Sequence, residues 1–169
     1  PTDWLSKFGG SAWAPFGDTG KYYLHLYDVT QADLNWHNPR VREELFKVVH
    51  FWLDKGVKGF RFDVINVIGK DEILENCPEN DGKPAYTDRP IVHEYLHMLN
   101  EETFGTDEAI MTVGEMSATN IENCILYTAP ERHELSMAFN FHHLKVDYEN
   151  GKKWTLKNFD FEELKRLFH

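Results

Sequence analysis

Two charged side chains, Arg61 and Asp63, interrupt the otherwise apolar segment GFRFDVINV at residues 59–67. On a β-strand these two would share one face, because side chains alternate between the faces. Phe60, Phe62 and Val64 would share the other face, which in a barrel is apolar and meets the helices. A charge that leaves water is stable only when it is paired, and an adjacent arginine favours the ionised form of an aspartate. An ionised and oriented carboxylate suits a nucleophile or a general base. A purely structural ion pair would explain the same two residues equally well.

A second acid, Glu115, ends a further apolar segment at residues 109–116. If both segments are neighbouring parallel strands, their carboxyl ends meet at one edge, and Glu115 lies beside Asp63. Two such carboxyl groups are the parts that glycoside hydrolysis needs, one to attack the sugar carbon and one to protonate the leaving oxygen. Gly114, directly before Glu115, is expected to leave room for a ligand to approach the backbone.

A third apolar segment, residues 133–141, is also predicted to be a strand. His142, His143 and Lys145 gather at its end and could bind a ligand, although ordinary polar loop residues would give the same pattern. Alternation predicts an apolar set facing the helices, Leu135, Met137, Phe139 and Phe141, and an inward set, Glu134, Ser136, Ala138, Asn140 and His142.

The stretch HEYLH at residues 93–97 matches the HExxH pattern of zinc proteases. On a helix, at 100° per residue, Val92 and Leu96 fall on the apolar side, and His93 and His97 fall on the opposite side. We therefore expect both histidines to face solvent, and we expect neither a metal site nor a cofactor.

The elements that carry these residues alternate between helix and strand. Asn38 is predicted to be a helix N-cap, with Pro39 at the first helical position and Gly56 at the end. Helices are predicted at 38–56, 90–105, 119–129 and 159–168, strands at 58–65, 109–116 and 133–141, a polar loop at 70–89, and an irregular layer with short strands such as 21–27 at 1–36.

Strict alternation of this kind predicts an α/β fold with a parallel sheet. The sequence contains no GxGxxG and no GxxxxGK[ST], so a nucleotide-binding doubly wound sheet is disfavoured. A segment of a (β/α) barrel is the better interpretation, with its chemistry where the strands end.

Composition narrows the class of partner. The 169 residues carry a formal net charge of −10, which argues against nucleic acid or an anionic membrane as a partner. The two cysteines, Cys77 and Cys124, are far apart in sequence and predict reduced thiols in a cytoplasmic protein. The chain begins at Pro1 without a methionine, and we expect both ends to lie inside a larger protein.

Three motifs resemble signatures of the α-amylase family, glycoside hydrolase family 13: QADLNW, GFRFDV and VGEM. The resemblance covers essentially the whole chain. It implies the central part of a (β/α)8 TIM barrel at residues 37–169, preceded at residues 1–36 by the tail of an inserted B domain. The family's DxxxNH region and its later HD region, which supplies a third acid, do not occur. A slice of this kind is expected to be inactive alone and could self-associate through exposed sheet edges.

The same resemblance assigns roles by position. Asp63 is the implied nucleophile, Glu115 the implied acid/base, and Arg61 the residue that holds the nucleophile ionised. Val64, directly after Asp63, is similar to the branch of the family that prefers bonds other than α-1,4. The family's usual Ser is replaced by Gly69.

The resemblance also bears on the substrate. Family members that act on neutral α-1,6-linked oligosaccharides tend to have an acid where His142 stands, and no lysine shortly after it. The exchange of negative for positive charge suits a phosphate near the leaving sugar, bound by Lys145 with His142 or His143. The implied activity is retaining hydrolysis of a phosphorylated disaccharide, trehalose 6-phosphate. The alternatives are a neutral oligosaccharide substrate, and a non-catalytic amylase-like partner domain of the kind that loses its catalytic acids.

Overall fold

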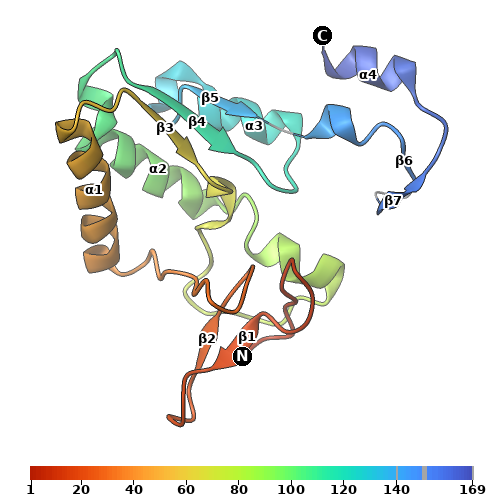
Figure 1. Ribbon diagram of the computed structural model, residues 1–169, viewed down its shortest axis with the longest axis horizontal. Helices are drawn as coiled ribbons and strands as arrows, with labels where there is room; N and C mark the ends of the chain where they lie inside the picture. Colours follow the sequence, from red (N-terminus) through yellow and green to blue (C-terminus); the bar gives the residue numbers. More distant parts are fainter. Residues whose placement is uncertain (140, 150–151, 169) are drawn as a thin grey trace.

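The computed structural model describes residues 1–139, 141–149 and 152–168 (Figure 1). A parallel three-stranded sheet lies at the centre, with α2 behind it and α1 at its side in this view. A separate antiparallel pair, β1 and β2, lies near the N-terminus, and the C-terminal elements extend away from the sheet. Within the described residues, no helix combines the length and apolarity needed to span a bilayer.

The central sheet contains β3 (Gly59–Phe62), β4 (Met111–Glu115) and β5 (Met137–Phe139), in that spatial order. Both neighbouring pairs are parallel, as the alternation of helices and strands predicts. The described residues also form two antiparallel pairs: β1 (Trp13–Pro15) with β2 (Tyr22–Leu24), and β6 (Tyr148–Glu149) with β7 (Lys152–Leu156). The last pair lies where the sequence predicted only a loop.

In the part of the chain that the structure describes, four α-helices follow the predicted order: α1 (Pro39–Asp54), α2 (Pro90–Glu102), α3 (Ile121–Thr128) and α4 (Phe161–Leu167). The predicted start of α1 is confirmed, because the Asn38 side chain accepts a hydrogen bond from the backbone N–H of Arg40 at 3.0 Å. Gly56 ends the helical segment with a φ of +85°, which favours glycine.

Strand β3 is shorter than the predicted 58–65. Val64 adopts a left-handed φ of 43°, and Ile65–Val67 then forms a 3-10 turn. The apolar run resembles a strand because both apolar residues of this turn, Ile65 and Val67, are buried, but they enter different cores. Ile65 joins the core under the sheet, and Val67 joins the core of the N-terminal layer.

The core under the sheet joins strands to helices. It is formed by buried side chains of α1, α2 and α3 and of the segments next to the strands and helices: Val49, Ile65, Val92, Leu96, Leu99, Phe104, Met116, Cys124, Tyr127 and Leu135. Phe60 and Phe62 pack against it from β3, so their predicted helix-facing side is confirmed. Burial of these apolar side chains supplies the main force that holds helices to the sheet.

A second core holds residues 1–27 against the segment that follows β3. Trp4 is buried at its centre, and its indole N–H donates to the carbonyl oxygen of Glu75 at 3.0 Å. Gly82 has a φ of +87°, and a Cβ there would lie 2.7 Å from the Trp4 ring, so only glycine fits. The predicted loop 70–89 is thus partly ordered, with 3-10 turns over Glu79–Ala85.

Of the third segment's residues predicted to face the helices, Leu135 lies in the core under the sheet as predicted, but the facing of Met137 and Phe139 is wrong. Strand β5 pairs Met137 with Val113 and Phe139 with Glu115, and paired residues in a parallel sheet point to the same side. Met137 and Phe139 therefore share the inner face with Glu115, while Ala138 packs against the core. The prediction fails because residues 133–136 are not strand, so alternation cannot be counted through them. Glu134, predicted to face inward, is only 3% exposed and lies on the helix side, and Asn140 lies outside the described residues.

The sequence suggested that Gly114 leaves room for a ligand to approach the backbone, but the structure gives this glycine a different role. It faces the helix side, where a Cβ would lie 2.6 Å from both Leu135 Cδ1 and Met116 Cε and 3.1 Å from Ile65 Cγ2. The side chain of the next residue, Glu115, points to the opposite face of the strand. Close packing under the sheet is therefore what requires a glycine here.

We expect Gly114→Ala to destabilise the protein by about 1–3 kcal/mol, because the added methyl overpacks a filled core. Chemical denaturation measures the free energy of unfolding. Gly59→Ala is the matched control on β3, since a Cβ there meets only an ordinary contact at 3.6 Å. Equal stability of the two variants would show that the core accommodates the methyl group.

Candidate active site

Asp63 and Glu115 converge at the carboxyl ends of two neighbouring strands. The parallel register pairs Phe62 with Gly114, so Asp63, the next residue along, is level with Glu115. The Arg61 guanidinium lies between them. Its Nη2 is 2.8 Å from Asp63 Oδ1 and also forms an ion pair with Glu115 Oε2. The structure thus brings together all three side chains that the sequence singled out for chemistry.

The apolar segment around Arg61 and Asp63 suggested that their charges are buried, but both side chains are largely exposed. The side chain of Arg61 is 50% exposed and that of Asp63 is 74% exposed, whereas Glu115 is 19% exposed. They lie on the inner face of the sheet, which in the described residues is open to solvent. The ring of Phe139 lies 5.8 Å below the Arg61 guanidinium and forms part of the same face.

Glu115 has the electrostatic surroundings of a proton donor. Burial raises the pKa of Glu115, and a hydrogen bond to Asp63 and the charge of Asp63 raise it further, while the Arg61 charge opposes them. The raised pKa agrees with the direction expected of the acid/base residue in a pair of unequal carboxyl groups.

Tyr27 is a neighbour of the acids that sequence reasoning missed. Burial raises the pKa of Tyr27, and the charges of Tyr86, Asp63 and Glu115 add to the shift. Lys7 lies with its Nζ 5.6 Å from the centre of the Tyr27 ring and donates a hydrogen bond to Ser117 Oγ at 2.5 Å. Burial, followed by the charge of Lys83, lowers the pKa of Lys7 to about 8. No motif in residues 1–27 marks either residue, because their position depends on how the second core folds.

A cavity of about 230 Å³ opens beside the nucleophile candidate. Asp63 and Val64 line one side, and the segment 31–36, which contains QADLNW, lines the other. This segment is anchored by Lys70, whose Nζ is 2.8 Å from Asp33 Oδ1 in a mostly buried pair. Burial raises the pKa of Asp33 and lowers the pKa of Lys70, and their mutual attraction opposes both shifts. His37 Nε2 adds a hydrogen bond to the Lys70 carbonyl oxygen at 2.7 Å.

The predicted phosphate-binding residues line a different hollow. His142 and Lys145 border a cavity of about 340 Å³ with Lys157, together with the acids Asp160 and Glu163. His142 Nε2 hydrogen-bonds the carbonyl oxygen of Thr119, in the loop after β4, at 2.7 Å. The ring of His143 instead lies 5.8 Å from that of Phe168. The structure therefore brings two of these three residues together at one cavity.

The two HEYLH histidines differ: the side chain of His93 is only 16% exposed, so its predicted solvent-facing position is wrong, whereas that of His97 is 43% exposed. His93 Nδ1 is 2.7 Å from Glu134 Oε2, and the His93 ring stacks on Tyr127 at 4.5 Å. His97 Nδ1 is 3.0 Å from the carbonyl oxygen of Arg132. The helical-wheel argument placed them opposite the sheet, but that side of α2 also contacts the chain around α3 and β5. Their partners explain them as structural residues.

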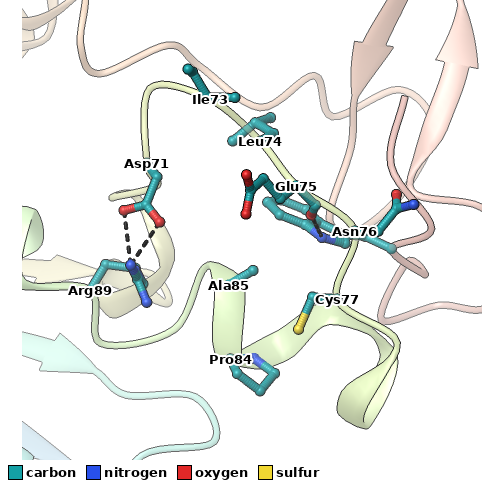
Figure 2. Close-up of a pocket in the computed structure, with 10 residues that line it drawn as sticks. Asp71, Ile73, Leu74, Glu75, Asn76, Cys77, Pro84, Ala85 and Arg89 are labelled. Carbon is teal, nitrogen blue, oxygen red and sulfur yellow. Dashed lines mark hydrogen bonds and ion pairs between the residues drawn. The ribbon is translucent and has the colours of Figure 1, made fainter.

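A further pocket lies in the N-terminal layer, between residues 71–77 and the 3-10 turns at Glu79–Ala85 (Figure 2). Arg89 reaches into its rim, where its Nη2 bonds both carboxylate oxygens of Asp71, at 2.9 and 2.7 Å. Cys77 and Leu74 line the opposite part (Figure 2). None of Arg61, Asp63 and Glu115 lines this pocket, so it is separate from the paired acids.

Comparisons with known proteins agree with this arrangement. The family model described as "Alpha amylase, catalytic domain" matches residues 1–169. A trehalose-6-phosphate hydrolase of Bacillus subtilis (strain 168) is 57% identical, over 99% of this chain and 30% of the relative. An oligo-1,6-glucosidase of Parageobacillus thermoglucosidasius is 45% identical, over 98% and 30%. A crystal structure of Bacillus licheniformis trehalose-6-phosphate hydrolase superposes with a TM-score of 0.93 at 58% identity, over 99% of this chain and 30% of that one.

The chain therefore spans about 30% of the length of these relatives. The resemblance inferred from QADLNW, GFRFDV and VGEM is confirmed by the match along the whole chain. The chain belongs to the alpha-amylase family, and its parallel strands and helices are part of that family's TIM-barrel-type catalytic domain.

Proposed function

We propose that this chain carries the nucleophile and the acid/base of a retaining α-glycoside hydrolase that converts trehalose 6-phosphate and water into glucose and glucose 6-phosphate. The observation that carries the proposal is the pairing of Asp63 and Glu115 through Arg61 at neighbouring strand ends. The substrate is supported by the 57% identity to a trehalose-6-phosphate hydrolase. Because the chain spans about 30% of that relative, the activity belongs to a complete catalytic domain.

The chemistry follows from the two carboxyl groups. An Asp63 carboxylate oxygen attacks the anomeric carbon while the bond from that carbon to the bridging oxygen breaks, and Glu115 donates its proton to the departing oxygen. Glu115, now ionised, then takes a proton from water, whose oxygen bonds to the anomeric carbon and displaces the Asp63 carboxylate. The ion pair with Arg61 orients the Asp63 carboxylate before the attack. The exposed position of Asp63 leaves it accessible to a sugar.

We further propose that residues 1–36 are the end of an inserted B domain and that residues 37–169 are part of the barrel. This division is supported by the antiparallel pairing of β1 with β2 and by the separate core around Trp4. A cytoplasmic location fits the two free thiols of Cys77 and Cys124. We expect the isolated chain to self-associate, because β3 and β5 each form an outer edge of the described sheet.

Substrate selection is proposed to involve two places. Val64, which lines the cavity beside Asp63, would contact the sugar that Asp63 attacks. Lys145, with His142 or His143, would bind the phosphate of the leaving sugar. The shared cavity of His142, Lys145 and Lys157 supports a local positive charge, although Asp160 and Glu163 border it as well.

The test of activity uses a grafted enzyme, in which residues 1–169 replace the matching 30% of the Bacillus subtilis relative. We expect it to hydrolyse trehalose 6-phosphate in preference to isomaltose, and we expect Asp63→Asn and Glu115→Gln to lower kcat by about 1,000-fold or more. Coupled detection of glucose, which both substrates release, measures the rates. Preference for isomaltose would instead support the neutral-substrate alternative. Full activity of Asp63→Asn would contradict the assigned nucleophile.

Lys145→Ala should raise the KM of the grafted enzyme for trehalose 6-phosphate by about tenfold, because one charge-assisted hydrogen bond to phosphate is lost. Hydrolysis of 4-nitrophenyl α-glucoside, which has no phosphate, should be unchanged. Lys47→Ala, at an exposed pair with Glu44 on α1, is the control lysine. A KM for the phosphosugar that Lys145→Ala leaves unaltered would exclude this phosphate site.

The pKa of Glu115 should respond in opposite directions to its two neighbours. Asp63→Asn removes a negative charge that raises the Glu115 pKa and should lower it, whereas Arg61→Met removes the opposing positive charge and should raise it. Carbon-13 NMR titration of the Glu115 carboxyl group measures both. In the reaction, the rate should fall as pH rises through the Glu115 pKa, because the proton donor is lost. Shifts of the same sign in both variants would contradict this electrostatic assignment.

A further inference from the structure

Backbone pairing between β3 and β4 ends before the two loops that follow Asp63 and Glu115. The last paired residues of β3 and β4 are Phe62 and Gly114. Directly after them the chain turns away at Val64, with its left-handed φ of 43°. Strand hydrogen bonds therefore cannot set the distance between the segment that follows Asp63 and the segment that follows Glu115.

Beyond the end of the strand pairing, the side chain of Asn66 connects the two loops. The amide of Asn66 donates from Nδ2 to the carbonyl oxygen of Ser117 at 2.8 Å and accepts at Oδ1 from the Ser117 N–H at 2.9 Å. Asn66 lies three residues after Asp63, and Ser117 lies two residues after Glu115. The planar amide thus satisfies both backbone groups of one residue, as a neighbouring strand would. Asn66 is 0% exposed, so water does not compete for these bonds.

Asp88 holds this amide in one orientation. Its Oδ1 accepts the second bond from Asn66 Nδ2 at 2.8 Å, and its backbone N–H donates to the Asn66 carbonyl oxygen at 3.0 Å. Asp88 itself receives hydrogen bonds from Asn123 Nδ2 and from the Tyr127 hydroxyl, both at 2.9 Å and both from α3. With two acceptors facing Nδ2 and the Ser117 N–H facing Oδ1, a flipped amide would lose all three bonds and set oxygen against oxygen.

We propose that Asn66, held by Asp88, is a positioning residue that fixes the separation of the Asp63 and Glu115 carboxyl groups in the glycosidase reaction. The inference rests on the proposed function. A retaining mechanism needs its two carboxyl groups about 5–5.5 Å apart. A displacement of about 1 Å between reacting groups can cost about 100-fold in rate. The described contacts join the two loops just beyond the acids, where a small rotation of either would change that separation.

The test compares Asn66→Ala in the grafted enzyme with Asn100→Ala as a matched control. Asn100 also donates one part-buried amide hydrogen bond, to the Glu134 carbonyl oxygen at 3.0 Å, but it lies on α2 away from the acids. We expect Asn66→Ala to lower kcat about 10- to 100-fold with KM changed less than about threefold. Both variants should lower Tm, and Asn100→Ala should leave kcat within about twofold.

A pH profile separates positioning from mere stability. If the carboxyl groups move apart, Asp63 raises the Glu115 pKa less, and the alkaline limb of kcat/KM shifts to lower pH. Arg61, Tyr27 and Lys7 are the other charged or titratable groups described near the acids, and none of them is substituted in the variant. A kcat and a pH profile that match the unaltered graft, with only Tm reduced, would overturn the inference.

Two further variants keep the result interpretable if Asn66→Ala does not fold. Asn66→Asp has the same size but loses both donated bonds, and it should lower kcat in the same way. Asp88→Asn changes the partner that orients the amide, and the double variant Asn66→Asp with Asp88→Asn should lose no more rate than Asn66→Asp alone, since Asp88 acts through Asn66. Additive losses would show that Asp88 acts by another route.

Failure of the proposed substrate can be told apart from failure of this inference. If the unaltered graft cleaves 4-nitrophenyl α-glucoside but not trehalose 6-phosphate, the substrate proposal fails, and the Asn66 variants are judged on the glucoside. If neither is cleaved, crystal structures of the graft and its Asn66→Asp variant decide. An unchanged separation of the Asp63 and Glu115 carboxyl groups would overturn the positioning role, and an altered one would support it.

Discussion

Everything proposed for this chain depends on the parallel register of β3 and β4. Pairing Phe62 with Gly114 is what makes Asp63 level with Glu115, and a slip by one residue would turn one of the two acids to the helix side. The register is held from below by close packing at Gly114 and from above by the Arg61 ion pairs. Because those ion pairs are partly exposed, they orient the side chains more than they stabilise the fold.

The features that the sequence predicted well are local in origin. Capping at Asn38 and the helix–strand alternation depend on neighbouring residues, and so does the facing of Phe60 and Phe62 on β3. Charged residues at the ends of apolar segments likewise indicate strand ends, which is why Arg61, Asp63 and Glu115 could be singled out. Their convergence follows from parallel pairing, and that pairing follows from the alternation.

The features that the sequence did not predict depend on contacts between distant segments. Alternation counted through residues 133–136 gave the wrong face for Phe139, because those residues are not strand. The outward side assigned to His93 was wrong because Glu134 comes from a segment 41 residues away. Tyr27 and Lys7 near the acids, and the amide of Asn66 between two loops, have no local pattern that could reveal them.

The short turn Ile65–Val67 separates its two apolar side chains between two cores, one under the sheet and one around Trp4. Asp63, the nucleophile candidate, is two residues before this turn, so the backbone that follows it is anchored in both cores. A substitution that expands either core will be transmitted to Asp63 through bonded geometry. Residues near Trp4 and residues under the sheet should therefore co-evolve across homologues, even where they are not in contact. The need to keep Asp63 in place would limit which substitutions the N-terminal layer can accept.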